Sequence, residues 1–85
     1  MSTITDQTLN KWKTGTAAQR VAADIVSEIT RRAWERYHEL PPTEYTASQH
    51  DVSPRTASRA KKLLLDMGML GKTGHVWYVA LRGRA

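Results

Sequence analysis

The sequence predicts a mostly α-helical domain that ends in one small β-hairpin. Residues 17 to about 38 lack Gly and Pro and repeat apolar residues with the period of an amphipathic helix. Ser53 followed by Pro54 is a strong helix start, and Gly68 is a helix stop. After Gly68 the pattern changes to short runs that are dense in β-forming residues, which indicates two strands.

Length and composition limit the classes of protein that the sequence can encode. The chain has 85 residues, enough for one domain with a modest core, and its 40% hydrophobic and 25% charged residues are ordinary for a globular chain. Residues 1–10 lack the apolar stretch of a secretory signal, and no apolar run reaches the roughly 18–20 residues that span a bilayer. The absence of cysteine excludes disulfides and zinc fingers. These features predict a cytoplasmic protein.

The chain begins with a segment that carries little sign of regular structure. Residues 1–16 are rich in Thr, Asp, Gln and Asn around a lone Trp12, and we expect a flexible N-terminal arm that is mobile or loosely docked. Thr16 and Gln19 form a capping-box pattern, which predicts that the first helix begins at residue 17.

The middle of the chain predicts a helix-turn-helix. Pro41 and Pro42 end the first helix, and Thr43 can cap a second, short helix over residues 44–49. Asp51 follows where a tight turn needs a left-handed residue, a conformation that Asp tolerates.

A third helix and a hairpin complete the domain. The third helix is expected over residues 54–67, and the strands over residues 69–72 and 76–80, joined at residues 73–75. The order of three helices and a two-stranded wing is that of a winged helix-turn-helix domain, here residues 17–80. Residues 81–85 form a basic tail in which Arg82 and Arg84 could contact DNA or face solvent.

Charge and pattern together favour a nucleic-acid partner. The formal net charge is +5, and residues 41–85 hold seven Lys and Arg against three Asp and Glu. Such a balance suggests a polyanionic partner. In the third helix four residues share one inward face, Ala57, Ala60, Leu64 and Met67.

The opposite face of the third helix carries cations and hydroxyls suited to the major groove. Arg55, Ser58 and Arg59 are the candidates for contacts with base edges. Thr56, Lys62 and Thr43 are candidates for phosphate contacts. With the cap and the wing, the predicted DNA-binding residues are Thr43, Ser53, Arg55, Thr56, Ser58, Arg59, Lys62, Lys72, Thr73, Gly74 and His75.

A set of short motifs runs from Leu40 to Val79: Leu40-Pro41, then Val52-Ser53, then Ala60, Leu64 and Gly68, then Tyr78-Val79. In these motifs, which align without a gap, the sequence resembles the GntR family of bacterial winged-helix transcription regulators. The resemblance implies a DNA-binding domain of a bacterial or mobile-element regulator. Family members usually carry a larger C-terminal domain that binds an effector and forms the dimer. This chain ends six residues after Val79, which indicates an excised domain or a stand-alone regulator.

The chain also departs from the family pattern at positions that matter for DNA contact. Glu44, Pro54 and Ser58 stand where the family commonly has Arg. Asp51 replaces a usual Gly and Lys61 a usual Leu, and the glycine-rich wing tip is reduced to Gly74. The family's base contacts therefore do not transfer directly at these places.

Other site types have weaker support in the sequence. Ser48, His50 and Asp51 contain the letters of a hydrolase triad but are close neighbours in one short segment, so we expect no enzyme. His38, His50 and His75 lack metal-ligand spacing, so no metal or other cofactor is expected, and no effector site is evident.

A homodimer through the first helix is a further hypothesis. Trp34 and Tyr37 lie near the end of this long helix, and with Trp12 they could form the contact. A two-fold dimer would read an inverted repeat. Alternatively, these aromatic residues cap the small core.

The sequence therefore predicts a sequence-specific, double-stranded DNA-binding transcription regulator, a repressor that is associated with the nucleoid when bound. One alternative is an architectural DNA-binding factor that acts in recombination directionality or partition. Another is a winged helix used for protein contact. RNA binding is also open, although the aromatic stacking surface expected for single strands is lacking.

Overall fold

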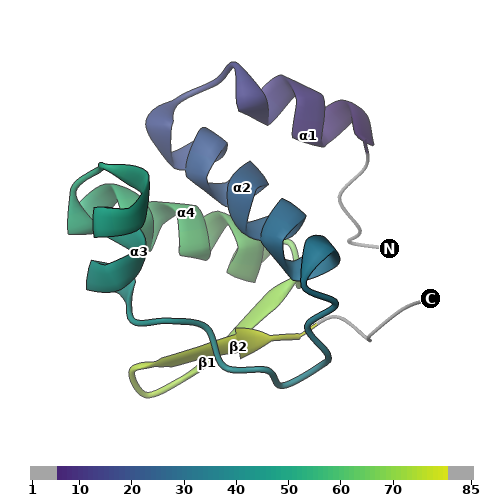
Figure 1. Ribbon diagram of the computed structural model, residues 1–85, viewed down its shortest axis with the longest axis vertical. Coiled ribbons are helices and arrows are strands. Elements are labelled where there is room, and N and C mark those ends of the chain that lie inside the picture. The colour runs from purple at the N-terminus through teal and green to yellow at the C-terminus, as the bar shows by residue number, and fades with distance from the viewer. Residues whose placement is uncertain (1–5, 81–85) are drawn as a thin grey trace.

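The computed structural model describes residues 6–80 and places four helices before a hairpin (Figure 1). The elements are α1 (Asp6–Lys13), α2 (Ala17–Arg31), α3 (Thr43–His50), α4 (Pro54–Asp66), β1 (Leu70–Thr73) and β2 (Val76–Val79). The helices pack around α2 and α4, and the hairpin lies along one side of them. The predicted fold class is confirmed, with one helix more than expected.

Helix α2 begins where the capping box predicts. The Gln19 amide N–H donates to Thr16 Oγ1 at 3.1 Å, and the Thr16 amide N–H donates to Gln19 Oε1 at 2.9 Å. Both amides belong to the helix start, where no intrahelical acceptor exists. The buried side chains of α2 follow the predicted apolar stripe: Val21, Ala22, Ala23, Ile25, Val26 and Ile29.

The prediction that the first helix extends to about residue 38 was wrong, because α2 ends at Arg31. Ala33 adopts a left-handed conformation with φ 54°, its N–H bonds the Thr30 carbonyl at 3.2 Å, and the Trp34 N–H bonds the Ile29 carbonyl at 3.1 Å. This is the bonding pattern of a Schellman helix end, which usually has Gly at the left-handed position. An Ala there gives no stop signal in the sequence.

The residues that were expected to continue the helix instead run beside β2. The Tyr37 N–H donates to the Val79 carbonyl at 2.7 Å, and the Val79 N–H donates to the His38 carbonyl at 2.9 Å. Glu39 and Tyr78 form an antiparallel bridge. These contacts cover the outer edge of β2 and outweigh the local helical preference of the segment.

The hairpin pairs β1 with β2 in antiparallel register, from Leu70 opposite Val79 to Thr73 opposite Val76. Gly74 turns the chain with φ 61°, so the turn occupies residues 74–75 within the predicted range. Gly71 lies opposite Tyr78, whose ring occupies the space that a Cβ at position 71 would need. The wing therefore needs glycine at both positions, for different reasons.

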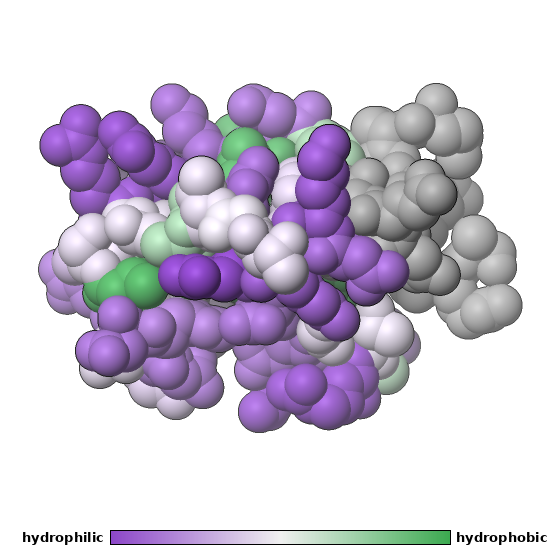
Figure 2. All heavy atoms as spheres, turned by 90° about the horizontal axis from the view of Figure 1, so that it is seen from above, coloured by the Kyte–Doolittle hydropathy of each residue, from purple (hydrophilic) through white to green (hydrophobic). Residues whose placement is uncertain are grey.

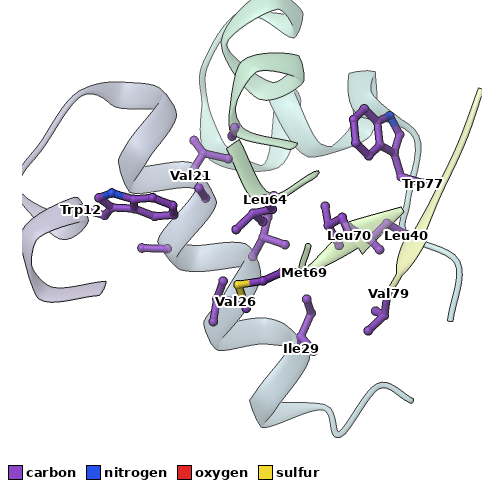
Figure 3. Packing of buried hydrophobic residues seen from close by; sticks show 14 residues of the cluster. Trp12, Val21, Val26, Ile29, Leu40, Leu64, Met69, Leu70, Trp77 and Val79 are labelled. Atoms are coloured by element: carbon purple, nitrogen blue, oxygen red, sulfur yellow. The ribbon is translucent and has the colours of Figure 1, made fainter. Parts of the chain in front are cut away.

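The prediction of an arm over residues 1–16 was wrong for the part that forms α1. This helix packs on α2, and its Trp12 is only 8% exposed and joins the core (Figure 3). Burial of an indole stabilises the docked helix, because Trp carries more apolar surface than most side chains. Seen from above, the surface is mainly hydrophilic with small, separate apolar areas (Figure 2).

The core joins α1, α2, α4 and the hairpin into one cluster. Leu64 of α4 lies between the apolar stripe of α2 and the strand residues Leu70 and Val79 (Figure 3). Leu40, from the segment that runs beside β2, closes the cluster at the hairpin side. Among residues 6–80, none of the helices combines the length and the apolar composition that a bilayer crossing requires.

Candidate nucleic-acid interface

The turn between α3 and α4 has the geometry that the sequence predicts. Asp51 is left-handed with φ 57°, and the Val52 N–H returns to the Ala47 carbonyl at 3.0 Å. Ser53 Oγ accepts the Thr56 N–H at 3.1 Å, and Pro54 occupies the first turn of α4. Helix α4 thus begins as expected, and its last helical residue lies one position before the expected end.

The predicted cap of the second helix was wrong. Pro42, not Thr43, is the capping residue of α3, and no side chain caps this end. Thr43 belongs to the first turn, and its Oγ1 accepts a hydrogen bond from Lys61 Nζ at 3.3 Å. Since a hydroxyl that accepts from an ammonium keeps its own proton, Thr43 still has a donor to offer.

Lys61 is a functional candidate that sequence reasoning missed. Lys61 has no exposed surface. Its Nζ donates a hydrogen bond to the Pro41 carbonyl at 2.9 Å and lies 5.8 Å from the centroid of the Trp77 ring. Burial lowers the pKa of Lys61 from the usual 10.5 to about 8. This side chain therefore links α4 to the start of α3 and to the wing.

The helical spacing contained a signal for Lys61. It lies four residues after Ala57 and three before Leu64, both fully buried, so it falls on the inward face of α4. A lysine on an inward face must bring its ammonium to hydrogen-bond acceptors. The acceptors here come from residues about 20 positions away.

An open cleft of about 520 Å³ lies between the first turns of α3 and α4 and the wing. Five predicted residues line it together: Thr43, Arg55, Ser58, Lys72 and His75. Glu44 and Trp77 line it as well. We call this the wing cleft. Lys72 Nζ lies 5.1 Å from the Trp77 ring centroid, so the same indole contacts a buried and an exposed ammonium.

Arg59 and Lys62 face a different cleft, farther along α4. It measures about 330 Å³ and is bounded by the start of α2, and we call it the α2 cleft. Thr16 and Gln19 of the capping box line it, as does the acidic Asp66. The cations of α4 are therefore divided between two clefts, with Arg55 in the wing cleft and Arg59 and Lys62 in the α2 cleft.

The remaining predicted residues lie at the ends of elements. Ser53 Oγ also donates to Thr56 Oγ1 at 3.0 Å, so both hydroxyls take part in the start of α4. Thr73 and Gly74 are exposed at the end of the hairpin. Among the described side chains, Arg32 forms an ion pair with Glu28, and the His50 imidazole lies against the Asp24 carboxylate. The exposed cations Arg55, Arg59, Lys62 and Lys72 thus have no carboxylate partner among residues 10–80, the range over which the side chains are described.

The structure also places the residues considered for catalysis and metal binding. His50 is partly buried at the end of α3, and its Nδ1 lies 3.4 Å from Asp24 Oδ2. His38 stacks on Trp34 with ring centroids 4.4 Å apart, and His75 is exposed at the wing turn. In the part of the chain that the structure describes, no group of three or more His, Cys, Asp or Glu could hold a metal ion. Residues 81–85, with Arg82 and Arg84, lie outside the described residues.

Comparison with known proteins identifies the fold. No protein-family model and no curated protein matches the sequence. Among solved structures, the chain is similar to YydK from Bacillus subtilis subsp. subtilis str. 168, which is described as a possible transcriptional regulator. The TM-score is 0.78 at 24% identity, and the match covers 84% of this chain but 32% of the other. The four helices and the hairpin therefore form a winged helix shared with part of that larger protein.

Proposed function

We propose that this chain is a sequence-specific, double-stranded DNA-binding transcription regulator. The observation that carries the proposal is the wing cleft, where the first turn of α4 and the wing present cations with no carboxylate partner among the described residues. A helix that begins at an exposed turn beside a hairpin can enter the major groove while the hairpin reaches the adjacent backbone. The description of YydK as a possible transcriptional regulator supports the same function.

In this proposal the wing cleft reads the sequence of the site. Arg55 can donate two parallel hydrogen bonds to a guanine edge, and Ser58, one turn later, can donate to or accept from a base. Both are exposed and near the start of α4, the part of a recognition helix that meets base edges. Lys72, Thr73, Gly74 and His75 of the wing contact the neighbouring backbone or minor groove.

The α2 cleft supplies affinity rather than selectivity. Arg59 was expected to contact a base, but it shares this cleft with Lys62, away from the wing. We therefore assign both cations to phosphates. Thr56 adds a phosphate contact, because its hydroxyl accepts from Ser53 and keeps its own proton for donation.

Regulation follows from occupancy. A bound domain covers promoter DNA and acts as a repressor, with phosphate contacts holding it and α4 selecting the site. The resemblance to the GntR family agrees with this mechanism and with a bacterial or mobile-element origin.

A homodimer remains part of the proposal. Because α2 ends at Arg31, the proposed dimer contact at Tyr37 lies in the segment after this helix and not on it. Trp12 and Trp34 pack with the core, whereas Tyr37 is 67% exposed beside Tyr78, with ring centroids 5.8 Å apart. Tyr37 also holds a left-handed φ of 72°, a conformation that costs energy for a bulky residue. Light scattering should give a dimer on DNA for the wild type and a monomer for Tyr37→Ser. A wild-type monomer both free and on DNA would remove the dimer from the proposal.

Selection of binding sites from a random duplex pool tests the proposed function directly. We expect one enriched motif, bound far more tightly than scrambled DNA at physiological salt. A two-fold symmetric motif would support the dimer. Binding without a motif, lost steeply as salt rises, would instead indicate an architectural or protein-binding role.

A further inference from the structure

Glu44 stands out because it is the acidic member of an otherwise basic cleft. It is exposed in the first turn of α3 and lines the wing cleft with Arg55 and Lys72. Among residues 6–80 its carboxylate forms no ion pair with either cation. Within residues 10–80 no ion pair occupies this carboxylate, so it can accept hydrogen bonds from a molecule that enters the cleft.

The position of Glu44 is held from behind. From a side chain with no exposed surface, Lys61 donates to the Pro41 carbonyl and to Thr43 Oγ1, which lie three positions and one position before Glu44. The Thr46 N–H bonds the Pro42 carbonyl at 3.0 Å and fixes the same turn. Because the backbone of this turn is already fixed, it loses little freedom when Glu44 binds, which favours a specific contact.

The chemistry of a carboxylate restricts what Glu44 can recognise. It accepts hydrogen bonds and cannot donate them, and it repels phosphates. In the major groove, the N4 amino group of cytosine is a donor that Glu and Asp accept from, whereas guanine presents acceptors to Arg. The wing cleft thus holds a carboxylate, Glu44, that suits cytosine and a guanidinium, Arg55, that suits guanine.

We propose that Glu44 is a specificity-determining residue that selects cytosine in the DNA site, beside a guanine read by Arg55. This inference rests on the proposed function, and it concerns the same cleft. Glu44 lowers general affinity for DNA by repulsion, and it favours cytosine because an amino hydrogen bond offsets that repulsion.

Site selection with the wild type, Glu44→Gln and Glu44→Ala tests the proposal. The wild type should require cytosine at one position, with other bases bound roughly 10- to 100-fold more weakly, as for a good base contact. Glu44→Gln should move this preference toward adenine, whose edge suits an amide. Glu44→Ala should bring the discrimination at this position close to one-fold and leave the rest of the motif unchanged.

Glu35→Gln is the matched control, since it makes the same charge change at an exposed residue that does not line the wing cleft. It should keep the wild-type motif. If Glu44→Gln kept the motif and tightened binding to every duplex equally, Glu44 would only repel phosphates, and the inference alone would be overturned. If the wild type enriched no motif, the proposed function and this inference would both be overturned.

Discussion

The wing cleft and the α2 cleft receive cations from the same face of α4, yet they differ in what surrounds those cations. The wing cleft is lined by α3, α4 and the hairpin. Trp77 forms part of its lining, and the buried Lys61 lies against the Trp77 ring. The α2 cleft has two helical walls, and its lining includes Asp66 and the capping box of α2. One helix face therefore contributes cations to one surface that is braced by three elements and to another that is bounded by two helices.

Lys61 accounts for much of this difference. In the wing cleft an ammonium, two acceptors and an indole hold α3, α4 and the hairpin in one arrangement. At the α2 cleft the hydrogen bonds are those of the capping box between Thr16 and Gln19, which fix the start of α2 but do not link it to α4. Selective recognition needs fixed geometry between elements, whereas attraction to phosphates depends mainly on charge.

The largest expected effect comes from removing the shared wall of the wing cleft. Trp77→Ala should lower the free energy of unfolding by about 3–5 kcal/mol, because a large buried side chain is lost and a cavity remains. Trp77 is 6% exposed, whereas Tyr45 of α3 is 55% exposed, so Tyr45→Ala is the control and should change stability little. Denaturant titration measures both variants. A loss below about 1 kcal/mol for Trp77→Ala would contradict the packing described here.

The next effect is a pH dependence from Lys61. Its pKa is about 8 in the folded protein, and its ordinary value of 10.5 applies to the unfolded chain. Between these values the unfolded chain binds more protons, so stability should rise with pH from 8 to 10.5. At about 1.4 kcal/mol for each pH unit in that window, the rise reaches about 3 kcal/mol.

Lys61→Met isolates this contribution from the other groups that titrate at alkaline pH. We expect the difference in unfolding free energy between wild type and variant to move in favour of the wild type from pH 8 to 10.5. Denaturant unfolding at several pH values measures it. A difference that stays constant over the window would show that burial does not perturb this ammonium.

Selectivity should depend on the wing cleft. Arg55→Ala should cost about 1–3 kcal/mol against the selected site and much less against scrambled duplex, since a bidentate base contact is lost. Affinity measurements on both duplexes at one salt concentration give the comparison. An equal loss on every sequence would place Arg55 on phosphate instead.

The smallest effects should come from the α2 cleft. Arg59→Ala and Lys62→Ala should each weaken binding to all duplexes alike and reduce the slope of log affinity against log salt by about 1. Salt titrations with selected and scrambled DNA measure this. A loss confined to the selected site for Arg59→Ala would return that residue to the base-reading group.

The local structure of the candidate interface was largely predictable because its signals are local. The start of α4 depends on Ser53 and Pro54, and the turn before it on a left-handed Asp51, all within a few residues. The end of α2 was not predictable, since Ala33 carries no stop signal and the following segment is held by Val79, over 40 positions later. Helix α1 was missed because eight residues with few apolar positions show no clear period.

The sequence by itself determined the order of the elements from residue 17 onward, the start of the second and fourth helices, and a cationic face on α4. These features follow from capping, proline and glycine geometry and apolar periodicity, which act over one or two turns. Tertiary structure alone decided that this face is shared between two clefts, that Lys61 is buried behind one of them, and that Trp12 belongs to the core. The physical reason is that burial and cleft lining are set by contacts between distant residues, and local sequence periodicity does not specify those partners.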